Sequence, residues 1–211
     1  MLEWLKKYKV RILLAVITSA ILVAIYFFVR AWYYRRYGII KDSSNTPQTN
    51  MSAARDYRGS GLVIGIENNN PFNIIEDGTP WQGKVAAINR FARFINLPYG
   101  IRAGVDSATN RLKANGGTIR AYIAGVPDGK GNLIMGYAPA SDGNTPDTYI
   151  AYICTALDCT ADEDMRGRLD HDTVKKLAWA HMEMENTYAA AHQYITDDDV
   201  EAGLSLTPYK S

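Results

Sequence analysis

Three consecutive asparagines followed by a proline, Asn68 to Pro71, constrain the fold of this chain more than any other stretch. Asparagine side chains compete with the backbone for hydrogen bonds, and the residue before proline is pushed to extended geometry, so neither a regular helix nor a central strand fits. Apolar residues flank the run at 62–64 and 72–75, which indicates a loop held against a core. A loop rich in carboxamides suits a glycan ligand, and turn or capping roles are the alternative.

A second segment, residues 12–29, contains 18 consecutive residues without a charge. This length reaches the threshold for a membrane-spanning helix. Basic residues lie on both sides, and aromatic residues such as Trp4 and Trp32 are typical of interfacial belts. The sequence therefore predicts a basic flank at 1–11 and a transmembrane helix at 12–34, with the lipid bilayer as a partner. A cleaved signal peptide is the alternative, and the missing small-residue cleavage site disfavours it.

Charge and cysteine content exclude several classes of function. Residues 42–211 carry 15 basic and 21 acidic residues, a net charge of −6, which is unfavourable for tracking a nucleic-acid backbone. Two cysteines, Cys154 and Cys159, are too few for a disulfide framework and are expected to be buried thiols. No Cys or His cluster has the spacing of metal ligands, so no metal and no cofactor is predicted.

The remaining sequence predicts a polar linker at 35–61 and a soluble domain at 62–211, mainly α with some β structure (α+β). Hydrophobic periodicity and capping residues predict helices over 100–115 and from Thr118, Thr145, Asp172 and Thr196. Residues 85–95 fit either a helix or a strand. The segment 125–144, rich in Gly and Pro, is expected to be a functional loop or an inserted hairpin.

The helix expected from Asp172 distinguishes two glutamates. At about 100° per residue, Glu185 lies only about 20° from the line of Ala178, on the apolar stripe, whereas Glu183 falls on another face. A carboxyl on an apolar stripe is desolvated, and desolvation raises its pKa. A glycosidase uses such a neutral carboxyl as general acid; the alternative is a glutamate that caps a helix or bonds a loop backbone.

Five motifs in a fixed order resemble a group of phage and prophage virion proteins related to lysozyme-like, peptidoglycan-degrading domains. The motifs are GIxNNNPxNI at 65–74, GTPWQG at 78–83, FxxFxxxxYGIRA at 91–103, YAPxSDGNTPxxYI at 137–150, and Ala180 with Glu185-Asn186, and the resemblance extends over about 65–206. The resemblance implies a lysozyme-like fold in a tail- or capsid-borne protein that opens the host wall during genome entry. It places the group's Glu-Asn pair on Glu185 and Asn186.

This chain departs from that pattern at three positions. Glu67 stands where the group has Arg, and Phe72 and Thr187 stand where it has Gly. These changes favour a second hypothesis, a structural virion protein at a vertex or entry complex that keeps a lysozyme-like shape without chemistry.

The first hypothesis is a membrane-anchored muramidase or lytic transglycosylase that acts on the peptidoglycan glycan strand. Glu185 would protonate the glycosidic oxygen, and a second carboxylate, with Glu67, Glu76 and Asp77 as candidates, would favour hydrolysis. Sugar contacts are expected from Asn68, Asn69, Asn70, Asn73, Trp81 and Tyr99. Other virion proteins would be partners, and the expected location is a virion internal membrane or a bacterial inner membrane, with the domain facing peptidoglycan.

Overall fold

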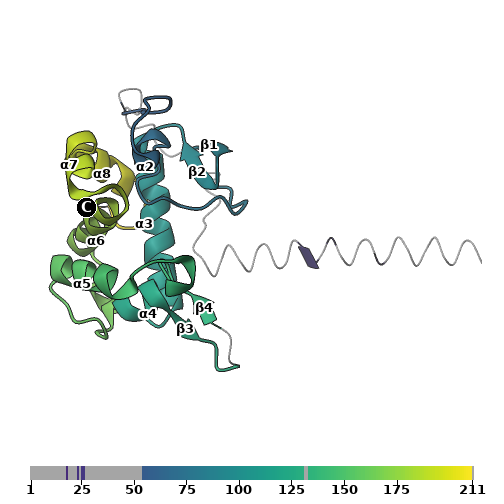
Figure 1. The fold of residues 1–211 in the computed structure, drawn as a ribbon, viewed down its shortest axis with the longest axis vertical. Helices are drawn as coiled ribbons and strands as arrows, with labels where there is room; N and C mark the ends of the chain where they lie inside the picture. Colours follow the sequence, from purple (N-terminus) through teal and green to yellow (C-terminus); the bar gives the residue numbers. More distant parts are fainter. Residues whose placement is uncertain (1–17, 19–22, 24, 27–53, 131–132, 211) are drawn as a thin grey trace, which may run out of the picture. The chain divides into compact units, whose positions relative to one another are not determined.

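The computed structural model describes residues 18, 23, 25, 26, 54–130 and 133–210 of the chain (Figure 1). The chain divides into two compact units, Met1–Asp42 and Ser43–Ser211. In the first unit the described residues, Thr18, Val23, Ile25 and Tyr26, are helical and exposed.

The predicted transmembrane helix at 12–34 falls mostly on residues outside those described. Among the described residues, no helix has both the length and the apolar character needed to cross a bilayer. A spanning helix needs about 20 consecutive residues, and only four positions of this range are described. The predicted fold class with an N-terminal transmembrane helix and the predicted single-pass membrane localisation are therefore not supported. The described residues form a mainly helical fold with two small sheets and no helix that could span a membrane.

The described part of the second unit is mainly helical, with two small antiparallel sheets. Its helices are α2 (Ile64–Glu67), α3 (Leu97–Ala114), α4 (Ile119–Ala124), α5 (Pro146–Leu157), α6 (His171–Asn186), α7 (Tyr188–Tyr194) and α8 (Asp197–Leu204), with 3-10 turns at Ala140–Asp142 and Met165–Arg168. Strand β1 (Lys84–Ile88) pairs with β2 (Phe91–Phe94), and β3 (Gly125–Pro127) pairs with β4 (Leu133–Met135). The ambiguous segment 85–95 is therefore a hairpin, and so is part of 125–144.

Helix α3 lies at the centre of the unit, between the hairpins on one side and α6, α7 and α8 on the other (Figure 1). Asn96 begins it by accepting a hydrogen bond from the Tyr99 backbone, and Pro98 occupies the first turn, where its missing N–H costs nothing. Its predicted apolar stripe is confirmed as buried: Ile101, Val105, Ala108 and Leu112.

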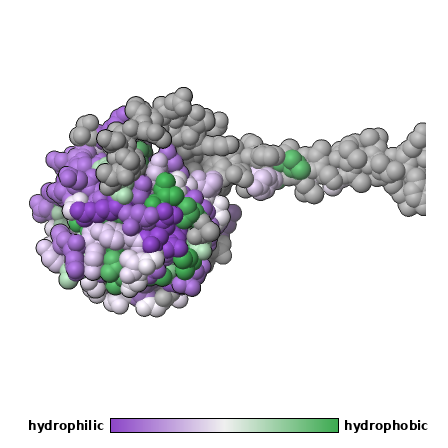
Figure 2. Space-filling model, turned by 90° about the horizontal axis from the view of Figure 1, so that it is seen from above, coloured by the Kyte–Doolittle hydropathy of each residue, from purple (hydrophilic) through white to green (hydrophobic). Residues whose placement is uncertain are grey.

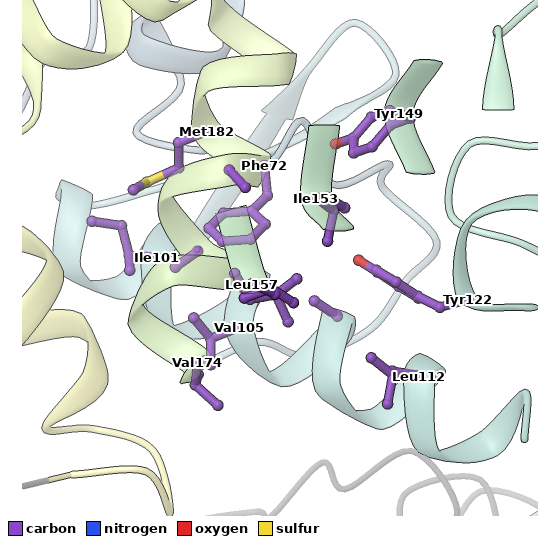
Figure 3. Close-up of a cluster of buried hydrophobic side chains, with 14 of the residues drawn as sticks. Phe72, Ile101, Val105, Leu112, Tyr122, Tyr149, Ile153, Leu157, Val174 and Met182 are labelled. Atoms are coloured by element: carbon purple, nitrogen blue, oxygen red, sulfur yellow. The ribbon is translucent and has the colours of Figure 1, made fainter. Parts of the chain in front are cut away.

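The core fills the space between α3, α4, α5 and α6. Figure 3 shows Phe72, from the asparagine loop, among side chains of these four helices. The loop is therefore anchored through an aromatic ring that is 1% exposed. On the face seen in Figure 2 the surface is mostly hydrophilic, with hydrophobic residues in small separate groups.

The end of the predicted linker packs on the domain. Tyr57 contacts the core, its N–H donates to Asn69 Oδ1 at 2.8 Å, and its hydroxyl donates to the Tyr194 carbonyl at 2.8 Å. Arg55 lies 3.4 Å from the Asp199 carboxylate. The folded part of the chain thus begins before Leu62, whereas 35–53 lie outside the described residues.

Candidate functional site

Helix α6 separates its two glutamates as its periodicity predicts. Asp170 begins the helix by accepting a hydrogen bond from the Thr173 backbone. Glu183 lies on another face of the helix, where its side chain is 13% exposed, its carboxylate is 2.6 Å from His192 Nε2, and it accepts a 2.7 Å hydrogen bond from the Tyr152 hydroxyl. Glu185 lies on the side of the buried residues and is itself half-buried.

Two side chains hold the Glu185 carboxylate, one on each oxygen. The Tyr149 hydroxyl, from the first turn of α5, donates to Oε1 at 3.0 Å. Asn73 Nδ2, from the asparagine loop, donates to Oε2 at 3.0 Å and to the Glu185 backbone carbonyl at 3.2 Å. Burial raises the pKa of Glu185, and these two hydrogen bonds oppose the shift.

A buried histidine lies directly behind Tyr149. His181 is fully buried, its Nδ1 lies 2.8 Å from the Tyr149 hydroxyl and its Nε2 lies 2.7 Å from the Tyr122 hydroxyl. Burial lowers the pKa of His181 to about 3, so its ring is neutral at ordinary pH, and burial raises the pKa of both tyrosines. In Figure 3 the hydroxyl ends of Tyr122 and Tyr149 both point toward the interior of the cluster.

The asparagine run is internal rather than exposed. Asn69 adopts φ 51°, and its Nδ2 donates to Asp56 and to the Phe94 carbonyl at 2.8 and 3.1 Å. Asn70 Nδ2 donates to the Ile74 and Ala92 carbonyls at 3.0 and 2.9 Å. The amides of Asn69 and Asn70 thus bond the domain's own groups, which is the turn role that the sequence left open.

Asn68 and Asn73 retain unused hydrogen-bonding capacity. Asn68 is 1% exposed, and neither amide atom has a partner among the described residues. Asn73 Oδ1 is likewise buried and unpaired there, although Nδ2 bonds Glu185. Of the four predicted sugar-binding asparagines, Asn73 alone has a hydrogen bond to Glu185 within the described part of the chain.

The predicted stacking residues Trp81 and Tyr99 lie together at a second, smaller cluster. Both pack against a group of buried residues formed by Ala92, Phe94 and Ala103. Tyr99 also lies over Gly83, where an added Cβ would come within 2.4 Å of its ring. Both rings are partly exposed, and the hydrogen bonds that hold Glu185 involve neither of them.

The three positions that differ from the virion-protein motifs have separate structural consequences. The Phe72 ring points inward, stacks on His181 at a centroid distance of 5.5 Å and fits where Gly104 lacks a Cβ. Thr187 ends α6 at φ 68° and ψ 149°, a conformation that favours glycine, and its hydroxyl accepts a hydrogen bond from the Ala190 backbone. Glu67 ends the short helix α2 and is half-buried.

Sequence reasoning assigned no role to His181, Tyr149 or Tyr122. The available signal was His181 itself, a titratable side chain on a stripe of apolar residues, which must find buried hydrogen-bond partners. Nothing in the sequence indicates which partners those are. Cys154 and Cys159 are free thiols that are half-buried rather than buried. No cluster of three or more metal-ligating side chains occurs within 54–130 and 133–210.

Comparisons with known proteins add nothing to this geometry. No protein-family model matches the chain. A search of curated proteins also finds no match.

Proposed function

We propose that this domain cleaves the glycan strand of peptidoglycan, with Glu185 as the general acid. The observation that carries the proposal is the environment of this carboxyl, which is desolvated yet not fully buried and is held by Asn73 and Tyr149. The resemblance to virion proteins adds a setting, a phage particle that opens the host wall during genome entry.

The chemistry requires a carboxyl group that carries a proton near neutral pH and releases it to a glycosidic oxygen. Burial raises the pKa of Glu185 and so enlarges the protonated fraction. Asn73 and Tyr149 fix both oxygens, so the carboxyl loses little freedom when it meets the substrate. Asn73, on the loop, is the best-placed contact for a sugar bound over the acid.

A single acid supports the transglycosylase route, in which a hydroxyl of the sugar itself closes an anhydro ring. Within the described residues, the side chains that bond the Glu185 carboxylate are Asn73 and Tyr149, neither of which is a carboxylate. Glu76 is 2.7 Å from Lys84 Nζ, and Asp77 accepts a 2.9 Å hydrogen bond from the Thr79 backbone. A hydrolase would instead place a second carboxyl about 5–9.5 Å from the first.

Purified peptidoglycan tests the proposal. The wild-type protein should release fragments with anhydro ends rather than reducing ends. Glu185→Gln should lower the rate by about 10²–10⁴-fold, the usual contribution of a general acid. Glu183→Gln is the matched control, because it changes the same residue type two positions away on another face of α6, where the carboxylate bonds Tyr152 and His192. Equal rates for wild type and Glu185→Gln would refute the assignment.

A second candidate is a structural virion component without catalysis. It is favoured by Asn69 and Asn70, whose amides bond the domain itself instead of facing a ligand. On this alternative neither wild type nor Glu185→Gln releases fragments from peptidoglycan. The two candidates therefore give opposite results in one assay.

A further inference from the structure

We propose that His181 and Tyr149 form a tautomer-coupled pair that keeps Glu185 hydrogen-bonded in both its ionised and its protonated state. The proposal rests on the proposed function, since it concerns how the acid is supported through a cycle of proton release and recovery. His181 and Tyr149 act here as positioning residues, because in the described structure they reach the reaction only through Glu185.

Four side chains form one continuous line of hydrogen bonds. The Tyr122 hydroxyl lies 2.7 Å from His181 Nε2, and His181 Nδ1 lies 2.8 Å from the Tyr149 hydroxyl. The Tyr149 hydroxyl in turn lies 3.0 Å from Glu185 Oε1. Helix α4 supplies Tyr122, α5 supplies Tyr149, and α6 supplies the other two.

Counting hydrogens fixes the direction of every bond when Glu185 is ionised. A carboxylate only accepts, so Tyr149 donates its single hydrogen to Oε1. The Tyr149 oxygen must then accept from His181 Nδ1–H. A neutral imidazole has one N–H, so Nε2 is the acceptor for the Tyr122 hydroxyl. Every donor in the line is paired.

Protonation of Glu185 reverses the donor and acceptor of each hydrogen bond in the line. Asn73 donates to Oε2, so the carboxyl proton resides on Oε1 and is donated to the Tyr149 oxygen. The change proceeds by transfer along the line: the Tyr149 hydrogen passes to Oε1, the His181 Nδ1 hydrogen passes to the Tyr149 oxygen, and the Tyr122 hydrogen passes to Nε2. One proton from solvent restores the Tyr122 hydroxyl, and the new Nε2–H is directed at the Tyr122 oxygen. The two states differ by one proton, taken up from solvent, and by the ring nitrogen that bears the hydrogen.

The packing allows this change of tautomer and disfavours rotation of the ring. Phe72 stacks on His181 at 5.5 Å, and the Tyr137 ring meets it edge-on at 4.6 Å. Burial keeps the pKa of His181 at about 3, so the ring does not become a cation that could no longer accept from Tyr122.

Few titratable groups in the described chain act on this line. The tyrosines come from α4, α5 and the segment after β4, namely Tyr122, Tyr149 and Tyr137, and burial raises the pKa of all three. Arg111 of α3 acts on Tyr122 and Tyr137 through its charge, and Glu185 acts on all three tyrosines. Glu185 is therefore the group whose titration reverses the direction of these hydrogen bonds.

The test is nitrogen-15 NMR of the histidine side chains in the full chain, without glycan, across a pH titration. The His181 signals should report an Nδ1–H ring above the titration of Glu185 and an Nε2–H ring below it, with no imidazolium. His171 provides the comparison, because its hydrogen bonds to Asp172 and Glu201 raise its pKa and its ring should become an imidazolium as pH falls.

Two variants sharpen the test. In Glu185→Gln the amide oxygen faces Asn73 and the amide N–H faces Tyr149, so His181 should hold the Nε2–H form at every pH. Tyr149→Phe keeps the ring but breaks the line, so the tautomer should no longer follow pH. Its kcat should fall, with KM little changed. Its pH–rate profile should shift to higher pH, because the lost hydrogen bond favours the Glu185 carboxylate and its loss raises the pKa of Glu185.

A His181 tautomer that stays constant in wild type while the Glu185 carboxyl titrates would overturn the inference, whatever the behaviour of the variants. If peptidoglycan is still cleaved in that case, the proposed function stands alone. If the tautomer follows pH but wild type does not cleave peptidoglycan, the coupling stands and the proposed function fails. The wild-type titration decides the matter even if Tyr149→Phe does not fold.

Discussion

Asn73 and Glu185 are 112 positions apart in the sequence, and one amide nitrogen of Asn73 bonds both the carboxylate and the backbone carbonyl of Glu185. This double contact joins the asparagine loop to the end of α6. It places the acid, the loop and the last turn of the helix at one point. Because Asn73 bonds the carboxylate itself, a substitution at Asn73 should change the pKa of Glu185 directly.

Replacing Asn73 by Asp should raise the pKa of Glu185 further. The variant sets a second carboxylate where the amide lies 3.0 Å from Oε2, and a like charge disfavours ionisation. The alkaline limb of the pH–rate profile should move upward by about one unit or more, as a property of the coupled pair. Asn89→Asp is the control, because Asn89 is exposed and has a similar φ of 58°. An unmoved profile for Asn73→Asp would separate Asn73 from the acid.

Asn70 should matter for stability rather than for substrate binding. Its amide makes three hydrogen bonds, two to carbonyls and one from the Ile74 N–H, and the side chain is 0% exposed. Asn70→Ala leaves buried backbone groups unpaired and should lower the free energy of unfolding by about 3 kcal/mol. Urea denaturation measures this loss. Asn144→Ala, at an exposed position with one 3.3 Å bond, should change it by less than about 0.5 kcal/mol. A folded Asn70→Ala protein with raised KM and normal stability would contradict the structural role.

Thr187→Gly should stabilise the protein. The backbone at Thr187, φ 68° and ψ 149°, lies in a region that glycine tolerates and a β-branched residue does not, at a cost of about 1–3 kcal/mol. Loss of the capping hydroxyl to glycine costs only a few tenths of a kcal/mol, so the net gain should be about 1 kcal/mol in thermal or urea unfolding.

Thr196→Gly provides the matched control for that gain. Thr196 also begins a helix, but at φ −112°, and it forms a reciprocal cap with Asp199. The same substitution there should destabilise the protein, since it relieves no strain and removes the cap. Destabilisation at both positions would show that Thr187 is not strained.

Gly65→Ala should displace the side chains of Asn73 and Asn186, which lie against Gly65. A Cβ at Gly65 would lie 2.1 Å from Asn186 Oδ1 and 2.9 Å from Asn73 Oδ1. The cost of such overpacking is about 1–3 kcal/mol, and activity should fall because Asn73 is displaced. Gly167→Ala meets nothing within 4 Å and should be neutral. Adding Asn186→Ala should recover part of the loss in stability, and simple additivity of the two changes would argue against the clash.

Glu185→Gln should become relatively more stable as pH rises. The folded-state pKa of Glu185 is raised by burial, so the folded protein binds more protons than the unfolded chain just above pH 4.5. Stability of the wild type therefore falls across that window and stays lower above the folded pKa, whereas the variant lacks this dependence. Urea unfolding of both proteins between pH 4 and 8 measures the difference. A variant that loses stability relative to wild type as pH rises would mean that the pKa of Glu185 is lowered in the folded state.

The sequence by itself determined the features that depend on neighbours along the chain. The apolar stripe of α3, the caps Thr118 and Thr196, and the opposite facing of Glu183 and Glu185 follow from helix geometry and local hydrogen bonding. Hydropathy read in the same way also predicted a membrane span at 12–34, and the helices within the described residues do not support it.

Only the tertiary structure decided which polar groups meet. The same carboxamide bonds equally well to a sugar or to a backbone carbonyl, so composition could not show that Asn70 bonds Ala92 while Asn73 bonds Glu185. His181 was visible as a polar residue among apolar ones, but its partners Tyr122 and Tyr149 come from other helices. A buried hydrogen bond depends on distances between segments far apart in the chain, and only the packing of those segments sets them.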